Sequence, residues 1–445
     1  MMPKVMGQKW SVCVCVCVFW VLQMKNSVGT RGQGEEPAAK PDHSEWNQVY
    51  LAVVSVLLGP VLLVLLDGCS AVEPGRLWAE SDGVGVALWD WTAFTIVVIF
   101  TVLQGALYYL PVGQVVEGKM GNQEKRLKYS LNGLHAFGVC VVLLVGAWQG
   151  GWLVAGSVTG RVLPLVSAGC AVALLISVCL YLRPDSAHSH ENTTGGFLQD
   201  FLLGREADPR LGKIDVKQFA MVRIGFIGWG LMDVCYVLRG VESDSVSSAL
   251  LLTTTFQLVY ILDFLIDEDT VLDTKEFMED SIGFLMVLGE YIWIPFFSSL
   301  PVYFLLQRPN HIHFLSAVPV ILLFGFGFLV YYLSNEQKSG FRRNPHNPAY
   351  SRLETIRSPS GRNLLVSGWF GWVRHPNYLG DVVMMLAWCL PCGFCSVLPY
   401  LPALQCFNLL RKRSTEVEES CREKHGSAWA EYCRRVPYKL IPYIY

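Results

Sequence analysis

Five polar side chains stand beside a long apolar run in the segment GWVRHPNYLGD, residues 371–381. They are Arg374, His375, Asn377, Tyr378 and Asp381. Polar and ionisable groups are costly to hold at a membrane boundary, so a group of this kind marks a functional site by default. Pro376 suits the first helical position, and a helix that begins there carries Asn377, Tyr378 and Asp381 on one face. We therefore expect a cytosol-facing pocket in a membrane bundle, suited to a polar cofactor beside an apolar substrate.

The composition indicates an integral membrane protein. Of 445 residues, 52% are hydrophobic and only 16% are charged, whereas a soluble domain carries about 25% charged residues. Backbone groups in lipid must pair within their own segment, so the apolar runs are expected to be helices. We predict an all-α, multi-pass transmembrane helical bundle of about 10 helices, with its cofactor pocket in the C-terminal half.

Apolar runs long enough to span a bilayer recur along the chain. They lie at about 48–66, 87–110, 131–150, 162–182, 218–238, 247–266, 282–306 and 313–333. A last stretch at about 379–410 is long enough for two crossings, with Pro391 and Gly393 at its bend. We divide the chain into a flexible N-terminal extension, residues 1–46, and a transmembrane domain, residues 47–445. The part 334–445 is expected to bind the cofactor.

The loop charges predict how the helices are oriented. Lys and Arg gather at 119–128, 205–217, 342–362 and 411–435. Because basic residues favour the cytosolic side, these segments and the C-terminus are expected to be cytosolic. A formal glycosylation acceptor at 192–194 then falls on the cytosolic side and is expected to stay unused.

Other kinds of site find little support in the sequence. A net charge of −2 gives no argument for nucleic acid binding. The fourteen cysteines are scattered and lie mostly in apolar segments, where cysteine acts as a small buried apolar side chain, so we expect no metal site. The chain has no GxGxxG after a strand and no GxxxxGK(S/T), HExxH or GxSxG. Any nucleotide must therefore be held by groups at the membrane edge.

Lys338 and Arg342 are the first candidates for such groups. They lie four residues apart just past the run at 313–333. A helix stacks them one turn above the other, where they can clamp phosphate oxygens. The alternative is a pair of cationic anchors that reach to the membrane surface. Residue types alone leave both interpretations open.

The motif resembles the membrane sterol reductase family, which includes delta-14 sterol reductases, 7-dehydrocholesterol reductases and the sterol-reductase part of the lamin B receptor. The resemblance covers about residues 87–445. It rests on LLVSGWFGWVRHPNYLGD (364–381), RVPYKLIPYIY (435–445), DFLLGREADPRLGKID (200–215), IGFIGWGLM (224–232), FQLVYILD (256–263) and FRRNP (341–345). The Pro after His375 and the short segment from Arg343 to Leu364 are most similar to the delta-14 branch.

This resemblance implies an enzyme of the endoplasmic reticulum membrane that uses NADPH to reduce the C14–C15 double bond of sterol intermediates in cholesterol synthesis. The inner nuclear membrane is a second expected location, membrane lipid surrounds the protein, and the oligomeric state stays open. The resemblance also implies a set of cofactor-binding residues. They are Lys338, Arg342, Leu365, Phe370, Asn377, Tyr378, Arg413, Cys421, Lys424, His425 and Tyr432.

The proton donor is expected in the upstream part of the chain. Tyr260 and Asp263 in FQLVYILD, with Glu268 beyond, are similar to polar residues that line the family's sterol cavity. A Tyr hydroxyl backed by a carboxylate can relay a proton, and burial raises the pKa of a carboxyl group. A hydrogen bond inside the membrane with no catalytic role is the equal alternative.

The sequence departs from the family in its tail. Glu416 and Val417 stand where an Arg-Asp pair is usual, and His425 replaces a Tyr before the tail glycine. These changes keep open a non-catalytic sterol-binding or scaffolding protein on the same fold. A 7-dehydrocholesterol-type reductase and a membrane methyltransferase, which shares an Arg-His-Pro-x-Tyr entrance, are the remaining alternatives. Glu416 and Glu418 are candidates to replace the lost carboxylate.

Overall fold

The structure is a computed structural model that describes residues 88–120, 126–183, 197–273, 277, 280–345, 347–359, 361 and 363–444. The N-terminal extension, the expected helix at 48–66 and the glycosylation acceptor lie outside these residues. The described residues up to Asn310 form one compact unit, and those from His311 onward form another. We call them the N-terminal unit and the C-terminal unit and describe each by itself.

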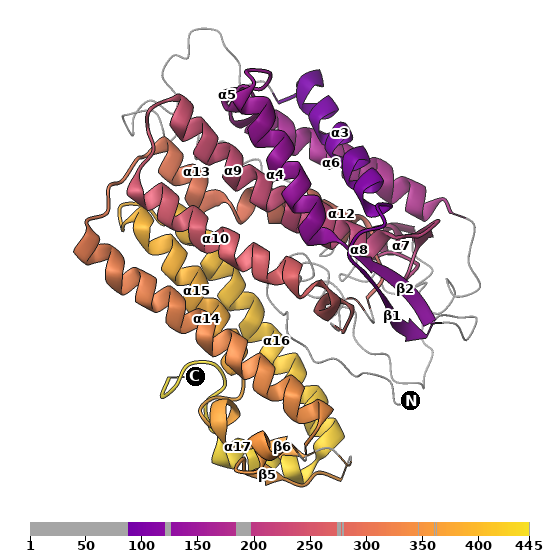
Figure 1. The fold of residues 1–445 in the computed structure, drawn as a ribbon. Helices are drawn as coiled ribbons and strands as arrows, with labels where there is room; N and C mark the ends of the chain where they lie inside the picture. The colour runs from indigo at the N-terminus through magenta and orange to yellow at the C-terminus, as the bar shows by residue number, and fades with distance from the viewer. Residues whose placement is uncertain are drawn as a thin grey trace, which may run out of the picture. The chain divides into compact units, whose positions relative to one another are not determined.

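The N-terminal unit is a bundle of apolar helices (Figure 1). Its longer helices are α3 (Trp91–Tyr108), α4 (Gly133–Gln149), α6 (Val162–Tyr181), α9 (Ile227–Glu242), α10 (Ser248–Ile266) and α13 (Leu300–Gln307). Its short helices are α5 (Ala155–Thr159), α7 (Phe197–Leu203), α8 (Val216–Gln218), η3 (Glu268–Asp273) and α12 (Phe284–Leu288). Two π-helical segments, η2 (Phe219–Phe226) and η4 (Gly289–Phe297), lead into α9 and continue α12. Its strands form two antiparallel pairs, β1 (Gln114–Met120) with β2 (Arg126–Leu131) and β3 (Arg210–Leu211) with β4 (Ile214–Asp215).

The two π-helical segments pack against each other. At their contact a Cβ on Gly225 would lie 2.1 Å from the Glu290 Oε2 atom, so a larger residue there would displace the end of the Glu290 side chain. In a π segment each backbone hydrogen bond spans one residue more than in an α-helix, and such segments are often found near functional sites. It depends on packing against neighbours rather than on a sequence period, and the apolar runs at 218–238 and 282–306 predict only helices.

The C-terminal unit is built on a helical hairpin. The long α14 (Phe314–Arg343) packs along α15 (Pro376–Cys389) (Figure 1). After the short η7 (Leu390–Cys392) and η8 (Leu398–Tyr400), α16 (Leu401–His425) follows, and α17 (Ser427–Arg435) closes the unit. Between α14 and α15 the chain forms η5 (Pro348–Tyr350), the strand pair β5 (Thr355–Ile356) and β6 (Leu364–Leu365), and η6 (Gly368–Gly371).

Two glycines allow α14 and α15 to approach closely. A Cβ on Gly327 would lie 2.9 Å from the Met384 backbone nitrogen. A Cβ on Gly380 would lie 2.5 Å from the Tyr331 backbone nitrogen. Small residues at helix contacts are the usual route to tight packing in membranes, where apolar burial gives no net advantage over lipid.

The helices confirm the all-α, multi-pass class. Within the described residues, six helices are long and apolar enough to cross a membrane, namely 91–108, 162–181, 216–242, 248–266, 284–307 and 314–343. A shorter apolar helix lies at Gly133–Gln149. The stretch at 379–410 divides into α15 and α16, with the break at the expected Pro391 and Gly393.

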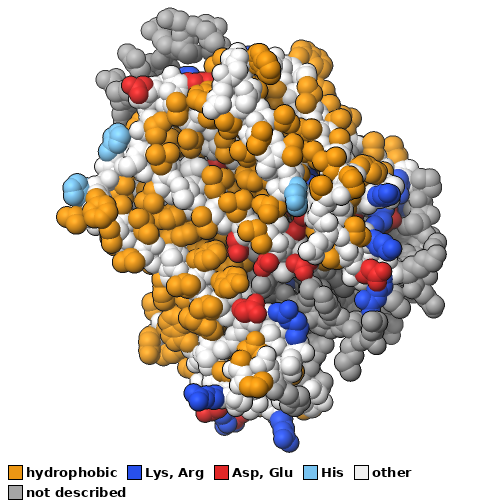
Figure 2. All heavy atoms as spheres, in the orientation of Figure 1, with side chains coloured by type: hydrophobic (Ala, Val, Ile, Leu, Met, Phe, Trp, Pro, Cys, Tyr) orange, Lys and Arg blue, Asp and Glu red, His pale blue; other side chains and the backbone are white. Residues whose placement is uncertain are grey.

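The surface of each unit agrees with a membrane location. Figure 2 shows hydrophobic side chains over the outer faces of the helices, with charged side chains gathered around β1–β2 and around the end that carries α17. On α14 the exposed side chains include Phe314, Leu315, Ile321, Leu322 and Leu329. An exposed apolar face of this kind fits contact with lipid.

Candidate functional site

Several of the expected cofactor residues converge where α14, η6 and α16 meet within the C-terminal unit. The Lys338 ammonium group lies 5.8 Å from the centre of the Phe370 ring. Leu365 and Phe370 are buried in one hydrophobic cluster with Phe341 of α14. The apolar cluster therefore holds the start of the motif segment against the helix that carries Lys338.

Positive charge gathers around Cys421 of α16. Burial raises the pKa of the Cys421 thiol, while the neighbouring Lys338, Arg342 and Lys424 act in the opposite direction. Arg342 and Lys424 are exposed, so they are accessible to an anionic ligand. Cations at one place suit phosphate oxygens, the chemistry that the spacing of Lys338 and Arg342 indicated.

Tyr432 of α17 contacts these residues through the backbone of Phe370. Its hydroxyl donates a hydrogen bond to the Phe370 carbonyl oxygen at 3.1 Å. Tyr432 is buried with Val366, Trp429 and Val436, and this burial raises the pKa of its phenol. We use the term cationic–aromatic cluster for Lys338, Arg342, Phe370, Cys421 and Tyr432.

The first turn of α15 presents Asn377 and Tyr378. Both are buried, at 3% and 6% exposure. The His375 ring stacks on the Tyr378 ring, with 5.0 Å between centroids and planes 6° apart. Burial lowers the pKa of His375, and Lys338 lowers it further, while Glu418 raises it. Phe370 of the cationic–aromatic cluster directly precedes the motif, and the charge of Lys338 acts on His375, so the motif lies beside the cluster.

Arg374 of the motif binds Glu418 and the C-terminal tail, which we define as residues 436–444. Its guanidinium group is used by these contacts and does not line a ligand pocket. Its Nε donates to Glu418 Oε1 at 2.6 Å, and its Nη1 donates to the carbonyl oxygens of Val436 and Pro437 at 2.9 Å each. Lys439 Nζ lies 3.0 Å from Glu418 Oε2. The expectation that all five polar groups of the motif form a ligand pocket is therefore too broad for Arg374.

Glu418 is thus committed to this ion cluster. Its side chain is 8% exposed. The charges of Arg374 at 2.6 Å and Lys439 at 3.0 Å, with the His375 ring nitrogen at 3.8 Å, outweigh burial and hold the pKa of the Glu418 carboxyl at about 2. The sequence offered Glu416 and Glu418 as replacements for a lost carboxylate at 417. Only Glu416 stays a candidate, since it lies 4.0 Å from the buried Arg413.

His425, another residue of the expected set, is the last residue of α16. It is 6% exposed, and its Nδ1 lies 2.6 Å from Ser358 Oγ. This contact ties the end of α16 to the segment between β5 and β6. His425 therefore has a structural partner in addition to its expected role.

The expected proton donors lie in the N-terminal unit. Tyr260 and Asp263 are three residues apart on α10, so they share a face. Tyr260 is 2% exposed, and its ring lies 6.1 Å from that of Trp229. Asp263 is half-buried. The shared face agrees with a relay between hydroxyl and carboxylate, which stays a prediction.

Glu268 has a clear structural role. Its Oε2 accepts from the Gly133 backbone nitrogen at 2.8 Å, and its Oε1 accepts from Gln218 Nε2 at 2.8 Å. Burial raises the pKa of this carboxyl group, and Arg223 opposes the shift. The bond from Gly133 ties the first turn of α4 to the start of η3.

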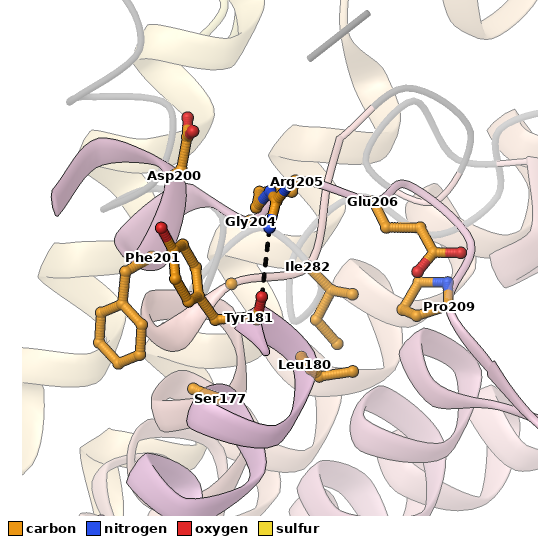
Figure 3. Close-up of a pocket in the computed structure, with 11 residues that line it drawn as sticks. Ser177, Leu180, Tyr181, Asp200, Phe201, Gly204, Arg205, Glu206, Pro209 and Ile282 are labelled. Atoms are coloured by element: carbon orange, nitrogen blue, oxygen red, sulfur yellow. Dashed lines mark hydrogen bonds between the residues drawn. The ribbon is translucent and has the colours of Figure 1, made fainter. Parts of the chain in front are cut away.

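The N-terminal unit also contains a small pocket, which the sequence did not indicate (Figure 3). Its lining includes Tyr181, Phe201, Gly204, Arg205 and Ile282. Arg205 Nη1 donates to the Tyr181 carbonyl oxygen at 3.3 Å, the bond drawn in Figure 3. A Cβ on Gly204 would lie 2.3 Å from the Ile282 carbonyl oxygen, so the backbones of these two lining residues approach closely.

One sequence pattern was overlooked. Cys389, Cys392 and Cys395 form two overlapping Cys-x-x-Cys pairs at the bend after α15. Cys389 and Cys392 are buried free thiols, and Cys395 is exposed. Among the described residues no group of three or more His, Cys, Asp or Glu side chains could hold a metal ion. The spacing alone therefore does not define a metal site.

The fold and the site together define a multi-pass helical membrane protein whose C-terminal unit carries a cationic–aromatic cluster. A sequence model described as the ergosterol biosynthesis ERG4/ERG24 family matches residues 76–445. The chain belongs to this family.

Known relatives extend the comparison. The chain is 42% identical over 363 residues to Delta(14)-sterol reductase TM7SF2 of Mus musculus, covering 80% of this chain and 87% of that protein. It is 33% identical over 415 residues to Delta(14)-sterol reductase LBR of Gallus gallus, covering 92% of this chain and 65% of that protein. It is 32% identical over 359 residues to Delta(14)-sterol reductase of Arabidopsis thaliana, covering 80% of this chain and 96% of that protein.

Proposed function

We propose that this protein reduces the C14–C15 double bond of sterol intermediates with NADPH as the hydride source. The observation that carries the proposal is the cationic–aromatic cluster beside the Asn377–Tyr378 turn. Three relatives named Delta(14)-sterol reductase, each aligned over at least 80% of this chain, support the reaction.

The residues of the C-terminal unit fit the proposed cofactor by their chemistry. Lys338, Arg342 and Arg413 supply positive charge for the phosphates. Phe370 and Tyr378 supply flat rings, and Asn377 supplies an amide that can both donate and accept hydrogen bonds. Leu365, Cys421, Lys424, His425 and Tyr432 complete the proposed binding set. When bound, NADPH supplies a hydride, which no side chain can provide.

The protein itself must supply the proton and exclude water. In the proposed reaction Tyr260, with Asp263 behind it, donates a proton to the alkene. A carbocation then develops at C14 of the sterol and is reduced. Glu268 is the third candidate, and the raised pKa of its buried carboxyl keeps its proton to higher pH, as an acid requires. The apolar helices of the membrane domain keep the cation away from water.

The proposed setting is an intracellular membrane, the endoplasmic reticulum, with a second location in the inner nuclear membrane. The substrate is a sterol dissolved in the bilayer, in cholesterol synthesis. The cytosolic C-terminal half then meets the cytosolic NADPH supply. The family match favours this reading over a membrane methyltransferase that shares only the Arg-His-Pro-x-Tyr entrance.

A non-catalytic sterol-binding protein on the same fold is the second candidate. The observation that favours it is Val417, which lies on α16 one residue from Glu418 and has no carboxylate. Because Glu418 is engaged by Arg374 and Lys439, it does not replace a carboxylate at 417. Only Glu416 is placed to do so, beside Arg413.

The proposal is tested by comparing sterol reduction by the wild type with that by a variant of the proposed cofactor site. Microsomes from sterol-reductase-deficient yeast that express the chain are given an 8,14-diene sterol and NADPH. We expect conversion by the wild type and its loss in Asn377→Ala. Asn408→Ala is the matched control, since Asn408 is exposed on α16. Sterol binding without conversion by the wild type would favour the second candidate, and methyl transfer to a lipid would overturn both.

A further inference from the structure

The C-terminal tail is attached to the motif along its backbone. The backbone nitrogens of Arg374 and His375 donate to the carbonyl oxygens of Tyr438 and Lys439 at 2.9 and 3.0 Å. The Arg374 guanidinium adds the bonds to Val436 and Pro437 described above. The tail therefore runs beside the two residues that immediately precede α15.

Glu418 is the centre of this attachment. It lies on α16, receives Arg374 from the motif at 2.6 Å, and receives Lys439 from the tail at 3.0 Å. His375 Nε2 lies 3.8 Å from the same carboxylate. Arg374 and Glu418 are each 8% exposed, and a buried charge that loses its partner is strongly unfavourable. One carboxylate thus ties α16, the motif and the tail together.

Each of these three segments leads into the proposed cofactor site. The motif continues into Asn377 and Tyr378, and the His375 ring stacks on Tyr378. Cys421 lies three residues after Glu418 on α16, and the two side chains interact electrostatically. The tail follows α17, whose Tyr432 bonds to the Phe370 carbonyl oxygen.

We propose that Glu418 is a positioning residue for the cofactor site: its carboxylate latches the C-terminal tail onto the Arg374–His375 segment and so fixes the first turn of α15. The inference rests on the proposed function, because the site it positions is the proposed NADPH site. Glu418 does not touch the cofactor in this account. Tail docking and NADPH binding are then thermodynamically linked, so each strengthens the other by the same factor.

The latch is tested on the full chain purified in detergent. A carboxypeptidase trims the tail of the wild type and of Glu418→Gln without cofactor. We expect the rate of trimming past Lys439 to rise about tenfold or more in the variant, because the charge-assisted bonds that hold the tail segment to Glu418 are lost. Glu419→Gln is the matched control, because Glu419 is the exposed neighbour on the same helix, and it should be trimmed at the wild-type rate. Equal rates for all three proteins would overturn the latch.

The positioning role is tested by direct NADPH binding to the same proteins. We expect Glu418→Gln to raise the dissociation constant for NADPH about tenfold, and saturating NADPH to slow tail trimming of the wild type by a similar factor. The KM for the sterol should stay unchanged, which a general loss of structure would not allow. Unchanged NADPH affinity in a protein whose tail is trimmed faster would overturn the positioning role.

Two further measurements separate failure of the positioning role from misfolding of the variant and from failure of the proposed function. If Glu418→Gln does not fold, Lys439→Met decides, because the Lys439 side chain is 21% exposed and its loss leaves Arg374 on Glu418. Lys439→Met should raise both the tail-trimming rate and the dissociation constant for NADPH, each by less than Glu418→Gln. A trimming rate and an NADPH affinity equal to those of the wild type would overturn the proposal. If the wild type binds no NADPH at all, the proposed function and the positioning role fail together, while the trimming rates still decide the latch.

Discussion

Arg342 and Arg343 are neighbours at the end of α14 with different surroundings. Arg342 acts on the Cys421 thiol within the cationic–aromatic cluster, whereas Arg343 lies 3.7 Å from Glu336 in an exposed ion pair. Exposed pairs contribute about 1 kcal/mol or less. A charge-assisted hydrogen bond to phosphate contributes about 1.5–3 kcal/mol. The two residues therefore allow a direct comparison of a cation proposed to bind phosphate with one that only pairs at the surface.

We expect Arg342→Ala to raise the KM for NADPH by at least about tenfold, from the loss of roughly 1.4 kcal/mol or more. Arg343→Ala should leave it within about twofold, as for other exposed pairs. Steady-state rates with varied NADPH measure both. Equal effects of the two substitutions would mean that α14 carries anchoring cations only.

A second residue-scale prediction concerns pH. Burial lowers the folded-state pKa of His375, so its contribution to stability is present above the unfolded value of about 6.5 and is lost as pH falls below it. Glu418, with a pKa of about 2 in the folded chain, loses its contribution only below about pH 4.3, its unfolded value. Between about pH 8 and about pH 5.5, the change in the thermal unfolding midpoint should therefore contain the contribution of His375 but not that of Glu418.

The variant His375→Phe isolates that contribution, since a Phe ring can keep the stack on Tyr378. Its unfolding midpoint should fall less on acidification than that of the wild type. The exposed His311→Gln should keep the wild-type slope. A His375→Phe slope equal to that of the wild type would contradict the assignment.

The sequence indicated the residues of the proposed cofactor set, which stays a prediction, but it did not indicate the ion cluster around Glu418. Asn377, Tyr378 and Lys338 were recognisable from their position at the ends of apolar runs and from the resemblance. Glu418 was noticed only as a possible replacement for a lost acid. Its pairing with Arg374 joins residues 44 positions apart, and no local pattern encodes such a contact.

At the scale of elements, the contact between α14 and α15 positions the site. It sets the end of α14, with Lys338 and Arg342, relative to the start of α15, with Asn377 and Tyr378. Gly380→Ala would push a Cβ to 2.5 Å from the Tyr331 backbone nitrogen, where backbone must move. Gly325→Ala on α14 meets nothing within 4 Å and is the matched control.

We expect Gly380→Ala to destabilise the protein by about 1–3 kcal/mol, the usual range for overpacking. Gly325→Ala should be neutral or slightly stabilising, because Ala favours helix by about 1 kcal/mol over Gly. Thermal unfolding midpoints in detergent measure the difference. Equal unfolding midpoints for the two variants would contradict the close approach of α14 and α15 at Gly380.

The helix positions followed closely from the apolar runs. The runs at 87–110, 131–150 and 247–266 correspond to α3, α4 and α10 within a few residues. The hairpin β1–β2 was missed because its basic side chains were interpreted only as a cytosolic loop. The π segments were missed because their hydrogen bonding depends on packing such as that of Gly225 on Glu290.

At the scale of the whole molecule, composition predicted a multi-pass helical membrane protein, and the helices confirm it. The division at His311 into two compact units was not predicted, because no linker composition marks it. The proposed donors Tyr260, Asp263 and Glu268 fall in the N-terminal unit, and the proposed NADPH residues fall in the C-terminal unit.

Orientation in the membrane gives the prediction that belongs to this scale. A tag fused after Tyr445 should be removed by protease added outside sealed microsomes, because the charges at 411–435 favour the cytosolic side. A lumenal marker protein should stay intact as the control for sealing. A protected tag would place the C-terminus in the lumen, away from cytosolic NADPH, and would contradict the proposed access to the cofactor.

The central claim is hydride transfer from NADPH to C14 of a sterol. The purified chain is given an 8,14-diene sterol and NADPH deuterated at the transferable position of the nicotinamide ring, in ordinary water. The account predicts a reduced sterol that carries one deuterium at C14, while the hydrogen at C15 comes from solvent. A reduced product without deuterium at C14, or sterol binding with no reduction, would contradict it.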